Sequence, residues 1–144
     1  MSAEATAVRG VTRHRLGQAR DARGSLAVAD FGADVPFVPR RCFVVYDVPG
    51  AEVRGEHAHR RCHQFLVCIR GACSLVVDDG RERAQMRLDS PALGVYVPPM
   101  VWAEQHGYTP DAMLLVLASD PYDPADYIRR YDEFVALAAG RAPR

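Results

Sequence analysis

Apolar residues in the middle of the chain occur in short runs that are separated by glycine, proline and aspartate. Runs of this length, bounded by turn-forming residues, are typical of an all-β domain. The clearest are 42-CFVVYDV-48, 65-FLVCIRG-71, 73-CSLVVDDG-80, 93-LGVYVP-98 and 112-AMLLVLAS-119. We therefore predict that these segments are strands of one all-β fold.

Two turn signals divide these runs. Gly71 separates the second run from the third closely enough to indicate a tight turn. Asp78, Asp79 and Gly80 form a hairpin signal, because aspartate and glycine tolerate the positive φ that short hairpin turns require. No internal repeat is evident along the chain.

The pattern changes after the last of these runs, where apolar residues recur at intervals of three and four, as one face of a helix requires. These residues are Tyr127, Ile128, Tyr131, Phe134, Val135 and Ala138. Asp123 is a suitable N-cap, Pro124 suits a first turn and Gly140 suits a helix end. We predict one terminal helix over residues 124–139, with its aromatic stripe packed against a sheet.

Composition limits the classes of function. The 144 residues, 49% of them hydrophobic, have the size of a single domain over residues 1–144. Eighteen basic and eighteen acidic side chains cancel, so we expect neither nucleic acid nor a membrane as a partner. No apolar segment is long enough to span a membrane and no signal peptide is visible, which favours a cytoplasmic protein. Residues 1–14 are expected to be disordered, or to form an arm that orders against a partner.

The four cysteines fall within or near strand-like runs of a chain without an export signal. They are Cys42, Cys62, Cys68 and Cys73. Disulfides are rare in reducing compartments. We therefore predict buried, reduced thiols rather than disulfides.

The segment 54-RGEHAH-59 contains two imidazoles one residue apart. Side chains alternate between the faces of a strand, so His57 and His59 are predicted to share a face. In a jelly-roll barrel one face lines an interior that can hold a small ligand, whereas the alternative is a solvent-exposed pair. Two imidazoles in an apolar cavity suit proton transfer, because their unperturbed pKa lies near neutrality.

A metal site is the other interpretation of these histidines. The chain resembles metal-binding cupins in its His-x-His frame, but Gln64 stands at their carboxylate position and Ala103 lies where their last histidine is expected. Sites for zinc, iron or manganese normally need three or more protein ligands. His63 and His106 are the residues that could complete such a set. We predict that no metal is bound.

Longer segments resemble the sugar 3,4-ketoisomerases, WxcM-like cupins that act on dTDP-4-keto-6-deoxyglucose. The matching segments are 21-DARGSL-26, 54-RGEHAHRRCHQFLV-67, 70-RGACSLVVDDG-80, 89-DSPALGVYVPPMVW-102 and 111-DAMLLVLASDPYDPADYIRRYDEF-134. The resemblance implies a cupin jelly roll without metal or other cofactor, and a dTDP-linked keto-sugar in the barrel mouth. It also implies a homodimer that exchanges N-terminal strands.

The resemblance further implies that His57 and His59 carry out acid–base catalysis. Moving a ketone from C4 to C3 requires loss of the C3 proton, passage through an enediol and addition of a proton at C4. Our hypothesis is that His57 removes the C3 proton, while His59 orients His57 or relays a proton to C4 or its oxygen.

Seven further residues are expected to bind the substrate: Arg23, Arg41, Phe43, Arg54, Gln64, Trp102 and Ala103. The guanidinium groups of Arg41 and Arg54 suit a diphosphate, and Arg23 is expected near the sugar. The alternative is that these arginines are ordinary surface charges. Trp102 is expected either to stack on thymine or to fill the barrel.

Two positions depart from the family pattern. Phe43 stands where relatives usually have tyrosine, and Ala103 where they tend to have histidine or arginine. Two alternative functions follow: a related cupin that acts on another sugar or natural-product intermediate, and a non-catalytic nucleotide-sugar binder or dimeric scaffold.

Overall fold

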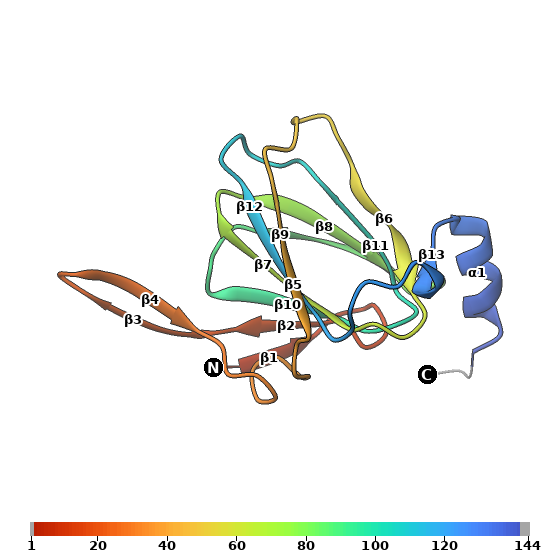
Figure 1. Ribbon diagram of the computed structural model, residues 1–144, viewed down its shortest axis with the longest axis horizontal. Helices are drawn as coiled ribbons and strands as arrows, with labels where there is room; N and C mark the ends of the chain where they lie inside the picture. Colours follow the sequence, from red (N-terminus) through yellow and green to blue (C-terminus); the bar gives the residue numbers. More distant parts are fainter. Residues whose placement is uncertain (1, 142–144) are drawn as a thin grey trace.

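The computed structural model describes residues 2–141, and within them two antiparallel sheets face each other (Figure 1). The first sheet contains, in spatial order, β1 (Ser2–Ala5), β2 (Thr12–Arg15), β10 (Leu93–Val97), β7 (Gln64–Arg70), β12 (Met113–Ala118) and β5 (Arg41–Tyr46). The second contains β13 (Tyr127–Ile128), β6 (Arg54–His59), β11 (Trp102–His106), β8 (Cys73–Asp78) and β9 (Arg83–Leu88). This arrangement confirms the predicted all-β, jelly-roll fold.

The five apolar runs form β5, β7, β8, β10 and β12, close to their predicted bounds. The hairpin signal is also confirmed, because β8 pairs with β9 across a loop in which Gly80 has a φ of 93°. Gly71, with a φ of 63°, joins β7 to β8. These two strands belong to different sheets, so the chain crosses between the sheets at this glycine.

The main core lies between the two sheets. Leu66 and Leu114 from the first sheet belong to the same buried cluster as Leu75 and Val77 from the second, and each is at most 1% exposed. Burial of one such side chain contributes about 1.5–3 kcal/mol. The facing apolar surfaces therefore hold the two sheets together.

All four cysteines are free thiols, and Cys62, Cys68 and Cys73 are buried as predicted. Cys42 is exposed, contrary to the prediction. It lies on β5, an outermost strand of the first sheet, where alternate residues face away from the core.

The terminal helix is shorter than predicted. Residues Pro124–Asp126 form a 3₁₀ turn (η1), Tyr127–Ile128 form β13, and only Tyr131–Ala139 form α1. The backbone of Tyr127 pairs with that of His59, so sheet pairing replaces the first turns of the expected helix. The predicted end is confirmed, because Gly140 follows α1 as its C-cap. No helix in residues 2–141 is long and apolar enough to span a membrane.

The N-terminal residues form strands rather than a disordered segment: β1 pairs with β2, and β2 pairs with β10. Next, β3 (Gly17–Asp21) and β4 (Gly24–Val28) form a separate hairpin. Figure 1 shows this hairpin projecting away from the two sheets, on the opposite side of the molecule from α1. It carries the predicted binding residue Arg23 at its turn.

A bulge in β6 sets the direction of the histidine pair. His57 pairs with Ala103 on β11, whereas Gly55 pairs with Glu104, so Glu56 is the extra residue. Gly55 and Glu56 both have positive φ, of 84° and 52°. Because of the extra residue, Arg54 and His57 lie on the same face of β6 although they are three positions apart.

Replacement of Gly55 by alanine is expected to destabilise the protein. Its φ is unfavourable for other residues, and an added Cβ would lie 2.9 Å from the Ala103 carbonyl oxygen. We predict a loss of about 1–3 kcal/mol in the free energy of unfolding, measured by denaturant titration. Gly50→Ala is the control, because a Cβ at Gly50 meets nothing within 4 Å. Equal stability of the two variants would show that the bulge does not require glycine.

Candidate active site

The two predicted histidines share a face of β6, as their spacing requires. Their ring centroids are 5.0 Å apart and the rings are nearly perpendicular, at 87°. Ala103 lies opposite His57 on β11 and belongs to the core between the sheets. The pair therefore faces the interior of the jelly roll rather than bulk solvent.

His57 is held by its own strand. Its Nδ1 lies 2.7 Å from the carbonyl oxygen of Gly55, and since a carbonyl only accepts, Nδ1 carries the proton. The pKa of His57 is lowered to about 4, mainly by burial and secondly by the charge interaction with the neighbouring His59. At neutral pH the ring is therefore uncharged, and Nε2 offers a lone pair.

His59 is held by a carboxylate from another element. Its Nδ1 lies 3.0 Å from Oδ2 of Asp126 in the η1 turn, and both side chains are buried. Burial lowers the pKa of His59, and the hydrogen bond and charge of Asp126 oppose that shift. Among residues 2–141, Nε2 of His59 is one of the buried polar atoms without a hydrogen-bond partner.

Tyr127 covers both imidazoles. Its ring centroid lies 4.9 Å from that of His57 and 4.4 Å from that of His59. The guanidinium carbon of Arg129 lies 4.3 Å from the Tyr127 ring centroid, within range of a cation–π contact. Tyr122 packs on Tyr127 at 5.6 Å. Tyr122, Tyr127 and Arg129 thus form an aromatic and cationic wall beside the histidines.

The first sheet continues this wall. The guanidinium carbon of Arg41 lies 5.2 Å from the ring centroid of Phe43 and 5.7 Å from that of Tyr122. Nε of Arg41 is buried and, in the described part of the chain, has no hydrogen-bond partner. Arg41 and the buried Gln64 both pair in register with Ala118 of β12, so they lie in one row across the sheet. The site therefore draws residues from both sheets.

The structure does not bring every predicted binding residue to this site. Arg23 is 90% exposed at the side chain and pairs with Asp21 at the far hairpin. Trp102 is buried in another cluster, where it packs against Tyr131 and Phe134. It therefore fills space beneath α1 instead of contacting the histidines. Arg54 lies on the same face of β6 as His57, at the exposed start of the strand.

One group of residues has the donor atoms of a metal site. Side-chain ligand atoms of His59, Cys62 and Asp126 lie within 4.8 Å of one another. However, the Asp126 carboxylate already accepts hydrogen bonds from His59 Nδ1 and from the backbone N–H groups of Arg61 and Cys62. A cation would have to displace these donors, so the arrangement fits a hydrogen-bonded carboxylate better.

The two histidines considered as further metal ligands do not complete the set. His63 stacks on Tyr96, with Nδ1 2.6 Å from the tyrosine hydroxyl. His106 ends β11, where its backbone pairs with Ser74. Neither belongs to the group of possible ligands around His59.

Four residues of the site were not identified from the sequence: Tyr122, Asp126, Tyr127 and Arg129. Periodicity assigned Tyr127 to the apolar face of a helix, and a helix at this position did not predict a contact between Asp126 and a histidine. The dipeptide Asp123-Pro124 was a correct signal for a turn with a side-chain cap, since Asp123 accepts a hydrogen bond from Ala125 N at 3.0 Å.

Comparisons with known proteins agree with this geometry. The family model FdtA, described as WxcM-like, C-terminal, matches residues 9–139. A curated relative from Aneurinibacillus thermoaerophilus is the TDP-4-oxo-6-deoxy-alpha-D-glucose-3,4-oxoisomerase. It is 46% identical over 114 residues, which are 79% of this chain and 82% of the relative.

Solved structures give the same result. One match is a histidine-to-asparagine mutant of the 3,4-ketoisomerase QdtA from Thermoanaerobacterium thermosaccharolyticum, in complex with TDP-4-keto-6-deoxyglucose. Its TM-score is 0.90 and its sequence identity is 32%, and the match covers 93% of this chain and 97% of that one. The TDP-quinovose 3,4-ketoisomerase WlaRB from Campylobacter jejuni matches with a TM-score of 0.85 and 36% identity, and the match covers 90% of this chain and 99% of WlaRB. These findings confirm the resemblance seen in the sequence. The chain therefore belongs to the FdtA family of WxcM-like, C-terminal domains.

Proposed function

We propose that this chain is a dTDP-sugar 3,4-ketoisomerase that moves the keto group of dTDP-4-keto-6-deoxyglucose from C4 to C3 in cytoplasmic deoxysugar biosynthesis. The observation that carries the proposal is the pair His57 and His59, both directed between the sheets and each with Nδ1 placed against a hydrogen-bond acceptor. The 46% identical relative is named for this reaction. The reaction moves protons only, so no cofactor is required.

The two imidazoles suit two separate proton transfers. The adjacent C4 carbonyl makes the C3 proton acidic, and Nε2 of His57 removes it. A proton that has exchanged with solvent is then added at C4. His59 moves a proton between the two oxygens, from the C3 hydroxyl to the C4 oxygen. The protons balance, and the sugar passes through an enediol.

The guanidinium groups supply charge for the nucleotide. Within residues 2–141, neither Arg41 nor Arg129 forms an ion pair with a carboxylate. Both guanidinium groups pack on aromatic rings of the site. They are therefore available to the diphosphate, which accepts paired hydrogen bonds from guanidinium. Gln64 and Phe43 would contact the sugar, and Arg54 would meet the nucleotide at the exposed start of β6.

A second candidate function is isomerisation of a different keto-sugar. Ala103, directly opposite His57, offers no polar group to the substrate, and Phe43 offers no hydroxyl. Relative to the family pattern, both residues make the site less polar. A sugar with a less polar substituent would fit these two residues better.

We also propose a homodimer in which the β3–β4 hairpin packs on the partner subunit. Leu26, Val28 and Phe31 are 62%, 48% and 56% exposed. They border a groove of about 570 Å³ that Phe65 and Leu117 of the first sheet also line. An exchanged hairpin would cover these apolar side chains. It would also bring Arg23 to the partner's sugar, which it does not reach within its own subunit.

His57→Asn tests the assignment of the base. Incubation of the wild-type protein with dTDP-4-keto-6-deoxyglucose in deuterated water should place deuterium at C4 of the product, detected by NMR. The variant should bind dTDP as tightly as wild type by calorimetry, and turn over on the order of 10²–10⁴-fold more slowly. Full activity of the variant would eliminate His57 as the base. Binding without exchange in the wild type would instead indicate a non-catalytic binder.

The pH dependence of the reaction follows from the low pKa of His57. A base works when it is neutral, so kcat/KM should fall only as pH is lowered through about 4. An unperturbed imidazole would already lose activity near 6.5. The profile should be recorded with circular dichroism at each pH as a control for folding. An acid limb at the unperturbed value would contradict the assignment of His57.

Leu26→Asp combined with Val28→Asp tests the dimer. Both side chains are exposed in a single subunit, so the substitutions should leave the fold intact while reducing the mass, measured by light scattering, from two chains to one. Arg23→Ala is the matched variant on the same hairpin, and it should remain dimeric while raising KM. A monomeric wild-type protein would refute this assembly.

A further inference from the structure

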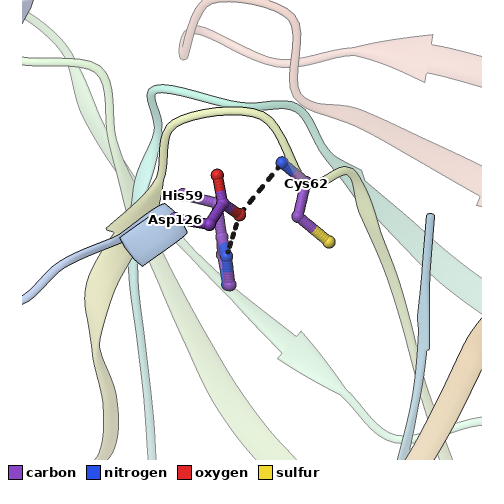
Figure 2. A group of neighbouring side chains, drawn as sticks. All are labelled: His59, Cys62 and Asp126. Atoms are coloured by element: carbon purple, nitrogen blue, oxygen red, sulfur yellow. Dashed lines mark hydrogen bonds and ion pairs between the residues drawn. The ribbon is translucent and has the colours of Figure 1, made fainter. Parts of the chain in front are cut away.

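Asp126 is a buried carboxylate surrounded by N–H groups. It is 4% exposed, and its Oδ1 accepts from the backbone of Arg61 at 2.7 Å. Its Oδ2 accepts from the backbone of Cys62 at 3.2 Å and faces His59 Nδ1 at 3.0 Å; Figure 2 shows the carboxylate between the imidazole and the Cys62 amide. Burial alone would raise the pKa of Asp126, but these hydrogen bonds lower it below its usual value. The group is therefore ionised at neutral pH.

An ionised carboxylate only accepts hydrogen bonds, and this fixes the tautomer of His59. The proton of the neutral imidazole must lie on Nδ1, and Nε2 must carry the lone pair. That nitrogen is buried and lacks a partner among the described residues. The ring centroid of Tyr127 lies 4.4 Å from that of the same imidazole, so this packing also restricts the orientation of the His59 ring.

We propose that Asp126 is a positioning residue of the reaction, which fixes the Nδ1–H tautomer of His59 and stabilises the ring when Nε2 takes a proton from the substrate. This inference rests on the proposed function. In it, His59 takes the proton of the C3 hydroxyl and returns it to the C4 oxygen, so each cycle leaves the imidazole neutral. Asp126 remains ionised throughout and transfers no proton.

The charges around His59 explain why this carboxylate is needed. Arg41 on β5 and Arg129 after β13 both disfavour a positive charge on the ring, and His57 lies beside it on β6. Of the described groups that act on His59, Asp126 alone is negatively charged. Without it, the protonated ring would be a buried cation next to two guanidinium groups, which is a costly arrangement.

The test compares Asp126→Asn with Asp123→Asn in the full chain. Asp123 belongs to the same turn, where its carboxylate binds Ala125 N and the Arg61 side chain, but it does not contact His59. We expect Asp126→Asn to lower kcat on the order of 100-fold with little change in the Kd for dTDP. Asp123→Asn should leave kcat unchanged. Equal losses in both variants would mean that the turn, and not the carboxylate, matters.

A double variant separates positioning from a general structural role. If Asp126 acts through His59, the kcat of Asp126→Asn/His59→Asn should equal that of His59→Asn alone, because two changes to one function are not additive. A double variant whose loss in kcat equals the product of the two single losses would contradict the proposal.

The tautomer itself can be measured without turnover. Nitrogen-15 NMR of the wild-type protein should show Nδ1 of His59 protonated and Nε2 unprotonated, and Asp126→Asn should shift this balance. A wild-type ring protonated at Nε2 would overturn the proposal whatever the activity. Conversely, the expected tautomer in a protein that does not isomerise the sugar would refute the proposed function and leave the role of Asp126 in holding His59 intact. Should Asp126→Asn not fold, the wild-type spectrum decides.

Discussion

The pairing of β6 with a strand on each side is the constraint on which the site depends. Its bulge against β11 turns His57 toward the interior opposite Ala103, and its pairing with β13 brings Tyr127 over His59. The same pairing brings the η1 turn close enough for Asp126 to reach the imidazole. Three segments distant in sequence therefore meet at one strand, and loss of the register would separate them.

The two imidazoles are neighbours on one strand, yet their surroundings differ. His57 donates to a neutral backbone carbonyl, and its pKa is lowered to about 4, so at neutral pH the ring is uncharged and able to accept a proton. His59 donates to an ionised carboxylate that compensates a transient positive charge. Because they share a face, both rings could reach one ligand. The different hydrogen-bond acceptors at Nδ1 would allow these two identical side chains to take different parts in the proposed isomerisation.

The sequence was informative where local pattern decides structure. The spacing of His57 and His59 was sufficient to predict that both histidines share a face, and short apolar runs predicted the strands β5, β7, β8, β10 and β12. It failed where tertiary pairing overrides local preference. Tyr127 and Ile128 fit a helical stripe but pair with β6, because the edge of that strand offers backbone partners. Contacts such as that of Asp126 with His59 leave no periodic signal, and the outward direction of Trp102 depends on where α1 packs.

The central claim is that His57 Nε2 faces the C3 hydrogen of a keto-sugar held between the sheets. The most direct measurement is a crystal structure of the His57→Asn variant with dTDP-4-keto-6-deoxyglucose bound. The account predicts that the substituted side chain lies about 3–4 Å from the sugar C3, with the C3 and C4 oxygens directed toward His59. A sugar bound with C3 directed away from β6, or bound outside the space between the two sheets, would contradict it.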